Sequence, residues 1–198
     1  MAGAILGYLV GSLPVGFLIA RTRGGVDLRR VGSGNVGATN VFRSAGPSMG
    51  VLVMLVDMAK GAGGVLLARA ILPGVGEDAA LAGLGAVVGH IYPVWLRFVG
   101  GKGVAVACGV FAVLAPLATI TAAACFVVAT WVTRYVSLGS VLASVTLPAV
   151  EWTRAGGDPV SLVATGASML IIFRHRGNLA RIVRGTERRL GQRAVANS

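Results

Sequence analysis

Short polar stretches rich in glycine interrupt an otherwise apolar chain, and the longest runs from Gly32 to Arg43. Glycines let the backbone turn sharply and approach a ligand closely. The other side chains supply hydroxyl and amide groups, and Arg43 supplies a planar guanidinium suited to phosphate or carboxylate. The candidate ligand-binding residues are Ser33, Gly34, Asn35, Gly37, Thr39, Asn40 and Arg43. The alternative is a polar loop that only joins two membrane helices.

A second stretch, Gly100-Gly101-Lys102-Gly103, stands immediately before a long apolar run. Free N–H groups on a glycine turn, a helix N-terminus and a lysine together predict an anion site. The stretch is not a Walker A loop, because the upstream glycine and the Ser or Thr after the lysine are missing. A flexible loop with a lysine that reaches along apolar surface remains the alternative.

Four further residues could carry charge or protons. Asp57 and Lys60 stand three apart inside an apolar run, so they share a helix face. A charge at membrane depth costs about 2.5–3.5 kcal/mol, so both are expected to face the protein interior. An ion pair that fixes helix packing is favoured slightly over a direct catalytic role. His90 is expected to pack within its motif, whereas His175 stands in a basic stretch and looks more available; either could act as a general base.

Several classes of chemistry lack their residues. There is no Gly-x-Ser-x-Gly elbow, and Cys108 and Cys125 lie inside apolar runs, so a covalent Ser or Cys mechanism has little support. The His-x4-Asp pattern of coenzyme-A-dependent acyltransferases is also absent, since Trp95 and Ala180 occupy the Asp positions. With no Asp-rich motif and two histidines, we expect no metal and no cofactor.

The composition indicates a polytopic, all-α integral membrane protein with one domain. Of 198 residues, 55% are hydrophobic and 13% are charged, with a mean hydropathy of +0.80; soluble domains carry about 25% charged residues. No cleavable signal is evident, because no basic segment precedes the first apolar run. The net charge of +11 does not predict nucleic-acid binding, because the arginines are dispersed between apolar segments.

Seven transmembrane helices are expected. The predicted segments are residues 2–20, 48–72, 79–98, 104–115, 117–133, 138–150 and 159–173. Residues 21–47 are expected to form a polar loop, and 174–198 a basic cytoplasmic tail. The uncharged run 104–133 would make a helix of about 45 Å, longer than a bilayer core of about 30 Å, so a turn is expected near Ala115-Pro116.

The basic residues predict the orientation. Fifteen of the eighteen Lys and Arg residues fall in 21–47, 97–103, 134–137 and the tail, which an odd number of spans places on one face. Because Lys and Arg collect in cytoplasmic loops, the N-terminus is expected outside and the C-terminus in the cytoplasm.

These stretches together resemble the bacterial acyl-phosphate:glycerol-3-phosphate acyltransferase family, the PlsY type. Its three motifs are similar to Gly32–Asn40 with Arg43, Gly89–Val104 and His175–Glu187. Smaller similar pieces are Gly11–Pro14, Asp57–Gly61 and Ser137–Ser140; residues 188–198 lie outside the pattern. The resemblance implies an enzyme of the bacterial cytoplasmic membrane with seven spans and an active site facing the cytoplasm. The family moves a fatty acyl group from acyl phosphate to the 1-hydroxyl of glycerol 3-phosphate, giving lysophosphatidic acid and phosphate in phospholipid synthesis.

The resemblance also implies site residues. By it, Ser33, His175, Asn178 and Glu187 are candidate catalytic residues. Candidate substrate-binding residues outside the first stretch are Lys60, His90, Gly100, Gly101, Lys102, Gly103 and Ser137. Phosphate leaves readily, so no protein nucleophile is required, and positioning with oxyanion stabilisation could supply most of the acceleration. Ser33, Asn35 or backbone N–H groups are candidate oxyanion donors, and the base is either His175 or a phosphate oxygen of the substrate.

The expected partners are the two small-molecule substrates and membrane lipid, with the protein a monomer that binds no nucleic acid. A small-solute transporter or channel is the alternative function. It requires polar residues through the full membrane depth, whereas these motifs lie on one face apart from Asp57 and Lys60. That asymmetry favours an enzyme.

Overall fold

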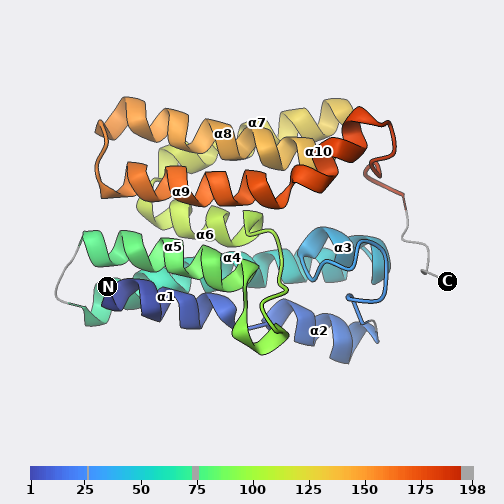
Figure 1. Cartoon of the computed structure of the whole chain (residues 1–198), viewed down its shortest axis with the longest axis horizontal. Coiled ribbons are helices and arrows are strands. Elements are labelled where there is room, and N and C mark those ends of the chain that lie inside the picture. Colours follow the sequence, from blue (N-terminus) through green and yellow to red (C-terminus); the bar gives the residue numbers. More distant parts are fainter. Residues whose placement is uncertain (26, 73–75, 193–198) are drawn as a thin grey trace.

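The computed structural model describes residues 1–25, 27–72 and 76–192, and their secondary structure is almost entirely helical (Figure 1). The helices are α1 (Ala2–Ser12), α2 (Val15–Gly24), α3 (Ala38–Ser44), α4 (Pro47–Ile71), α5 (Glu77–Ile91), η1 (Val94–Leu96, a 3₁₀ turn), α6 (Val104–Leu114), α7 (Pro116–Thr133), α8 (Val136–Ala155), α9 (Pro159–Arg174) and α10 (Arg176–Val183). The predicted all-α class is confirmed for these residues.

Five helical segments of the described chain have the length and apolar composition to cross a membrane. They are Ala2–Gly24, Pro47–Ile71, Glu77–Leu96, Pro116–Thr133 and Val136–Ala155. Two shorter apolar helices, Val104–Leu114 and Pro159–Arg174, occupy the fourth and seventh predicted segments. The protein is therefore a multi-pass membrane protein, and the count of seven stays a prediction.

Prolines set several helix boundaries. Pro47, Pro116 and Pro159 stand in the first turns of α4, α7 and α9, where a missing N–H costs nothing. The turn at Ala115 falls where it was expected. The first predicted segment is instead two helices, because Pro14 cannot continue α1 and α2 begins after it.

Three other predicted boundaries differ from the helices. Helix α5 ends at Ile91, before a proline, so residues 92–98 are not part of a long helix. Helix α8 runs to Ala155, five residues beyond the predicted end, so residues 151–155 are helical. The predicted polar loop 21–47 contains α3, which packs on α4.

The basic tail is not loose. After α10 the chain returns over the bundle, where the N–H of Leu190 donates to the carbonyl of Arg134 at 2.7 Å. The Arg134 guanidinium donates back to the Leu190 carbonyl at 3.4 Å. Residues 193–198 of the predicted tail lie outside the described residues.

A glycine seam joins α1 to α5. An added Cβ at Gly3, Gly7 or Gly11 would overlap the backbone of α5, and one at Gly85 or Gly89 would overlap the backbone of α1. Small residues at four-residue spacing allow such close packing in membranes, where no hydrophobic force draws helices together. The seam holds the two helices side by side at backbone contact.

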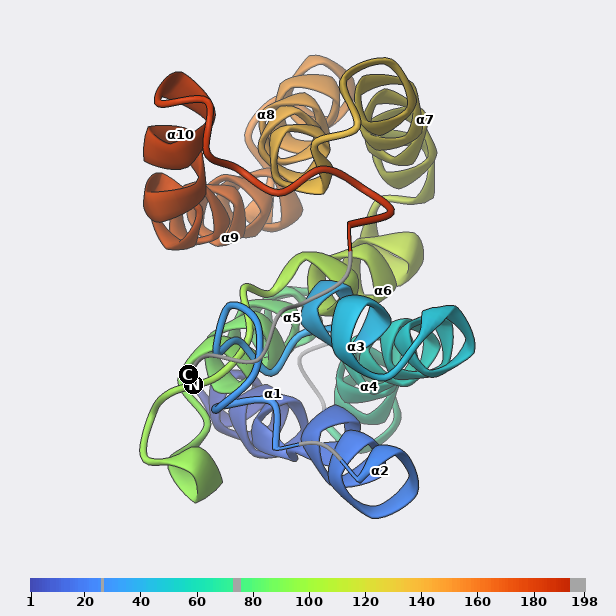
Figure 2. The same ribbon diagram turned by 90° about the vertical axis from the view of Figure 1, so that its right-hand side faces the viewer.

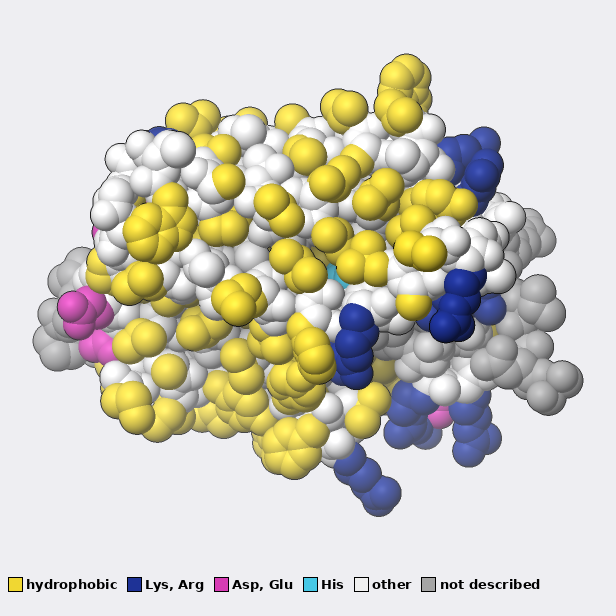
Figure 3. Space-filling model, turned by 45° about the horizontal axis from the view of Figure 1, so that its top comes forward, with side chains coloured by type: hydrophobic (Ala, Val, Ile, Leu, Met, Phe, Trp, Pro, Cys, Tyr) yellow, Lys and Arg dark blue, Asp and Glu magenta, His cyan; other side chains and the backbone are white. Residues whose placement is uncertain are grey.

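The helices form two groups, α1–α6 and α7–α10, which Figure 2 shows one above the other. Within the core, α5 and α6 pack against α9, mainly through alanine and valine side chains. Lys and Arg gather at one end of the molecule, most visible Asp and Glu lie at the other, and hydrophobic side chains cover the face between them (Figure 3). Large exposed apolar residues such as Trp131, Val132 and Met169 suit contact with lipid.

Candidate functional site

A cavity of about 780 Å³ lies where the two helix groups meet. Its polar part is built from residues 32–43, from the segment that begins α6, from the start of α8, and from residues 174–188. These segments are far apart in the sequence, and most come from the basic end of the molecule. The cavity therefore brings the predicted motifs to one place.

Most of the predicted site residues line this cavity. They are Ser33, Asn35, Gly37, Thr39, Asn40, Arg43, His90, Lys102, Gly103, Ser137, His175, Asn178 and Glu187. The predicted residues that do not line it are Gly34, Lys60, Gly100 and Gly101. Ser33 and Thr39 are exposed at the cavity, where their hydroxyl groups can meet a ligand.

Four arginines that were not among the predicted site residues also line the cavity: Arg174, Arg176, Arg181 and Arg188. With Arg43 and Lys102 they give six cationic side chains around one space. The sequence signal was the basic stretch after residue 173, but a run of arginines does not reveal which of them face inward. The site is therefore more basic than its predicted residues alone.

The guanidinium groups of Arg43 and Arg174 each have a hydrogen-bond donor without an acceptor among the described residues. Arg43 donates from Nη2 to the Arg188 carbonyl at 3.1 Å, and Arg174 from Nη2 to the Gly101 carbonyl at 3.5 Å. The Nε of each is buried and finds no hydrogen-bond acceptor among the described residues. A buried donor without an acceptor is costly, so ligand oxygens in the cavity would stabilise both groups.

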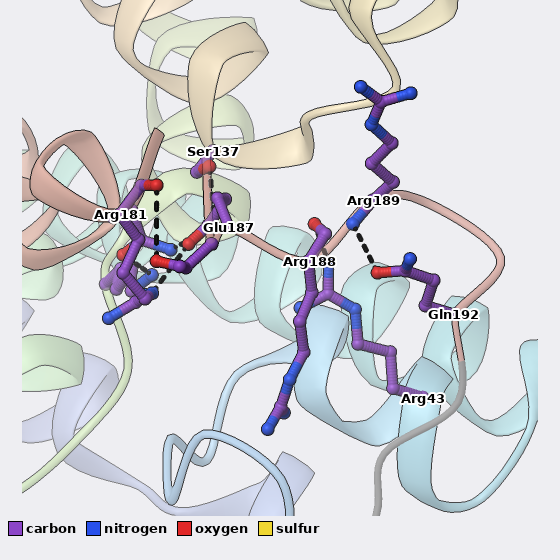
Figure 4. A network of polar contacts seen from close by, with 10 residues as sticks. Arg43, Ser137, Arg181, Glu187, Arg188, Arg189 and Gln192 are labelled. Carbon is purple, nitrogen blue, oxygen red and sulfur yellow. Dashed lines mark hydrogen bonds and ion pairs between the residues drawn. The ribbon is translucent and has the colours of Figure 1, made fainter. Parts of the chain in front are cut away.

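Glu187 is the centre of a hydrogen-bond network, shown in Figure 4 between Ser137 and Arg181. Its Oε1 accepts from Ser137 Oγ at 2.8 Å and from Asn178 Nδ2 at 2.6 Å, and its Oε2 accepts from Arg181 Nε at 2.7 Å. Burial raises the pKa of this carboxyl, but the three hydrogen bonds outweigh burial and leave its pKa below the ordinary value. Glu187 is therefore ionised at neutral pH, and it holds three residues that line the cavity.

Lys102 extends this network into the other helix group. Its Nζ donates to Asn178 Oδ1 at 2.6 Å, while the amide nitrogen of Asn178 is held by Glu187. Burial lowers the pKa of Lys102 to about 8, against the opposing charge of Glu187 and with help from Arg181, Arg43 and Arg174. An anion in the cavity would favour the charged ammonium.

His175 is buried, not available at the surface as the sequence indicated. Its Nδ1 lies 2.8 Å from the Ile171 carbonyl, which can only accept, so Nδ1 carries the proton and Nε2 has the free lone pair. Burial, with the nearby charge of Lys102, lowers the pKa of His175 to about 4. The ring is therefore neutral at physiological pH and presents a weakly basic nitrogen.

Two asparagines of the first stretch shape its backbone. Asn40 accepts at Oδ1 from the Ser33 N–H at 3.1 Å and donates from Nδ2 to the carbonyls of Leu28 and Val31 at 3.2 and 3.0 Å. Asn35 accepts at Oδ1 from the Gly37 N–H at 2.8 Å and donates to the Gly100 carbonyl at 3.4 Å. Their amides brace the loop that presents Ser33.

The glycine turn does not offer all the N–H groups that were expected to be free. The N–H of Gly100 donates to the Ile91 carbonyl and that of Gly101 to the His90 carbonyl, each at 3.1 Å. Helix α6 begins just after, and its first N–H groups have no acceptor within the helix. Since Gly103, Val104 and Ala105 line the cavity, the start of α6, not the two glycines before Lys102, faces the cavity.

Behind the turn lies the predicted ion pair. Lys60 Nζ is 3.1 Å from Asp57 Oδ1, and both side chains are buried. The same ammonium is 3.1 Å from His90 Nδ1 and 3.1 Å from the Leu13 carbonyl. Asp57 and His90 reach the cavity wall, whereas Lys60 stays behind it.

The inner part of the cavity is largely apolar. It runs between α4, α6, α7, α8 and α9 along Met54, Met58, Cys108, Phe111, Ala122, Ala123, Phe126, Ala143, Leu147 and Ile171. Serine hydroxyls on α8 are turned onto the backbone: Ser140 donates to the Val136 carbonyl, and Ser144 to the Ser140 carbonyl. This slot is suited to a hydrocarbon chain. Within the described ranges, no group of three or more His, Cys, Asp and Glu residues could hold a metal ion.

Comparison with known proteins gives consistent matches over almost the whole chain. A family model described as glycerol-3-phosphate acyltransferase matches residues 1–185. A glycerol-3-phosphate acyltransferase of Myxococcus xanthus is 46% identical over 185 residues, covering 93% of this chain and 96% of the relative. One from Syntrophotalea carbinolica is 42% identical over 182 residues, covering 92% and 93%.

Solved structures agree with the sequence relatives. The crystal structure of PlsY, an integral membrane glycerol 3-phosphate acyltransferase, in its glycerol 3-phosphate form superposes with a TM-score of 0.89 at 39% identity. Its lysophosphatidic acid form gives a TM-score of 0.86 at 37% identity. Each comparison covers 96% of this chain and 94% of the other.

Proposed function

The chain belongs to the glycerol-3-phosphate acyltransferase family, and on that premise we propose that its acyl donor is acyl phosphate. It is an integral membrane acyltransferase of phospholipid synthesis. In the proposed reaction a fatty acyl group passes from acyl phosphate to the 1-hydroxyl of glycerol 3-phosphate, and lysophosphatidic acid and phosphate are formed. The observation that carries the proposal is a single cavity in which a strongly basic part adjoins an apolar slot.

The charge of the cavity supports two phosphate-bearing substrates. Six cationic side chains line it against two carboxylates, Asp57 and Glu187, and both carboxylates are already paired with cations. Two phosphate groups would balance this excess and supply acceptors for the unpaired donors of Arg43 and Arg174. Structures of PlsY are described in glycerol 3-phosphate and lysophosphatidic acid forms, which supports one substrate and the product.

The apolar slot supports a fatty acyl chain on the donor. We assign the small phosphate head of acyl phosphate to the part of the cavity lined by Lys102 and the start of α6. In the transfer, the 1-oxygen of glycerol 3-phosphate bonds to the acyl carbon, and the bond from that carbon to the phosphate oxygen breaks. We assign Ser33 and the N–H groups at the start of α6 to the oxyanion that develops on the acyl carbonyl.

The proton of the 1-hydroxyl needs a base. With a pKa of about 4, His175 is a weak base at neutral pH, whereas a phosphate monoester titrates near pH 6. Because a base works best with a pKa near the operating pH, we assign proton removal to a phosphate oxygen of the substrate. We assign His175 Nε2 to accept a hydrogen bond from the other hydroxyl of glycerol 3-phosphate and so to orient the substrate, while Asn178 and Glu187 hold Lys102 in place.

We further propose that the cavity faces the cytoplasm of the bacterial inner membrane, with seven spans and the N-terminus outside. The gathering of Lys and Arg at the cavity end supports this orientation. One chain supplies every wall of the cavity described above, so a monomer suffices for the reaction.

The donor is tested by initial-rate kinetics of the purified protein with acyl phosphate and with acyl-coenzyme A, each with and without EDTA. We expect turnover with acyl phosphate in both conditions, little with the thioester, and inhibition by added phosphate. A matched pair of variants controls for charge: Arg181→Gln alters a cavity residue, and Arg184→Gln an exposed one outside it. Comparable rates with the thioester, or abolition by EDTA, would contradict the proposal.

A further inference from the structure

The cluster of Asp57, Lys60 and His90 is not explained by the proposed reaction. Lys60 does not line the cavity, yet its ammonium is buried and contacts three acceptors at 3.1 Å each. One acceptor is the carbonyl of Leu13, at the point where the chain leaves α1 before Pro14. A buried charge is tolerated only when its partners compensate it, so the cluster must be held in one geometry.

The contact with Lys60 fixes the hydrogen on the His90 ring. An ammonium has only donors, so Nδ1 of His90 must accept from Lys60. The ring hydrogen of the neutral imidazole is then on Nε2. Asp57 Oδ1 lies 3.1 Å from Lys60 Nζ and 3.6 Å from His90 Nδ1, so it holds the ammonium in place.

The Nε2 corner of His90 abuts Gly101. A Cβ built on Gly101 would overlap Nε2, and the three atoms closest to it all belong to the His90 ring. The same histidine accepts at its carbonyl from the Gly101 N–H. Gly101 does not have positive φ, so its φ suits alanine, and the His90 ring is the nearest obstacle to the added Cβ. The residue immediately before Lys102 therefore packs directly against the His90 ring.

We infer that Asp57, Lys60 and His90 are positioning residues: they hold the His90 ring against Gly101 and so fix the turn that carries Lys102 into the cavity. Neither Lys60 nor Asp57 needs to touch the substrate for this. The inference rests on the proposed function in one respect, namely that a substrate phosphate is the ligand of Lys102.

The contact is tested by a double-mutant cycle between Gly101→Ala and His90→Ala. The variant Lys102→Met first identifies the substrate whose KM depends on the lysine. Gly101→Ala and His90→Ala should each raise the KM of that same substrate by about tenfold or more. Because His90→Ala removes the atoms that would meet the new methyl group, the double variant should be no worse than His90→Ala alone. Independent effects would instead multiply to about a hundredfold.

Gly100→Ala is the matched control. Its Cβ would meet the carbonyl oxygens of His90 and Ile91 and the ring of Pro93, none of which the His90→Ala change removes. Its effect should therefore multiply with that of His90→Ala. If Gly101→Ala multiplies in the same way as Gly100→Ala, the inference is wrong.

The role of Lys60 is tested by the variant Lys60→Met. If that variant fails to fold because it leaves Asp57 unpaired, the double variant Asp57→Asn/Lys60→Met removes both charges and takes its place. Whichever folds should reproduce the KM pattern of Lys102→Met, and Lys60→Arg should restore part of the loss. A purely structural role predicts less folded protein with unchanged KM, and that result would overturn the inference. If the wild-type protein does not turn over acyl phosphate, the proposed function is refuted. The double-mutant cycle is then measured with the acyl donor that the protein does use, and it still tests the inference.

Discussion

Lys102 should impose an alkaline limit on activity. With its pKa lowered to about 8 by burial and neighbouring arginines, the ammonium of the free enzyme is lost as pH rises above 8. If the ammonium binds a substrate phosphate, kcat/KM falls with it. About one lysine in eleven is still charged one pH unit above the pKa, so kcat/KM at pH 9 should be roughly tenfold below its plateau, or about 1.4 kcal/mol.

Deprotonation of Lys102 does not destabilise the fold, so unfolding caused by this group cannot explain a loss of activity above pH 8. The pKa of Lys102 is 10.5 in an unfolded chain and about 8 in the fold, so on the order of 3 kcal/mol opposes the charged form in the empty cavity. The unfolded chain binds more protons between pH 8 and 10.5, and the fold therefore gains stability as pH rises through that window. The thermal midpoint should not fall where the activity does.

The assay is kcat/KM from pH 6.5 to 10 at constant ionic strength, corrected for spontaneous donor hydrolysis. Lys102→Arg keeps its charge beyond pH 12, so this weaker variant should lose the limit near pH 8. Arg184→Gln, exposed and outside the cavity, should keep it. A wild-type profile flat to pH 9.5, or an unchanged limit in Lys102→Arg, would refute the role of the ammonium.

Three further experiments test the Glu187 network, the base and the orientation in the membrane. Glu187→Gln should lower kcat/KM about tenfold to a hundredfold together with the thermal midpoint, because one amide cannot accept all three of its hydrogen bonds; unaltered kinetics would show that the network is dispensable. His175→Gln should keep the acid limb of kcat/KM near pH 6, since that limb belongs to the substrate phosphate; its disappearance would make His175 the base. Gly76→Cys should react with a membrane-impermeant maleimide on intact cells and Gln192→Cys should not, and the opposite labelling would reverse the proposed orientation.

Features set by local sequence were predictable. Composition and the rules of helix termination are enough to predict the apolar helices, the turn before Pro116 and the grouping of the motifs on one face. The pairing of Asp57 with Lys60 was also predictable, because three-residue spacing on a membrane helix leaves few alternatives. Spacing could not show the contact of Lys60 with His90, since α4 and α5 meet only in the folded bundle.

Features set by tertiary approach were missed. Gly100 and Gly101 look like free donors in sequence, but their N–H groups are taken by the end of α5 after the chain folds back. Arg174 and Arg181 belong to the predicted basic tail, but Arg174 ends α9 and Arg181 lies in α10, and both line the cavity. Helix α3 was missed because it is seven residues long and polar, so no apolar period marks it.

The glycine seam between α1 and α5 also has a consequence for biosynthesis. About 80 residues separate the end of α1 from the end of α5, which corresponds to roughly 4–16 s of translation at about 5–20 residues per second. During that interval the face of α1 that carries Gly3, Gly7 and Gly11 has no α5 to pack against, so lipid or the insertion machinery must cover it. A bulkier residue at Gly7 would therefore stop a late docking step and leave early membrane insertion unaffected. Pulse-labelled chains of such a variant would be inserted normally and then be degraded.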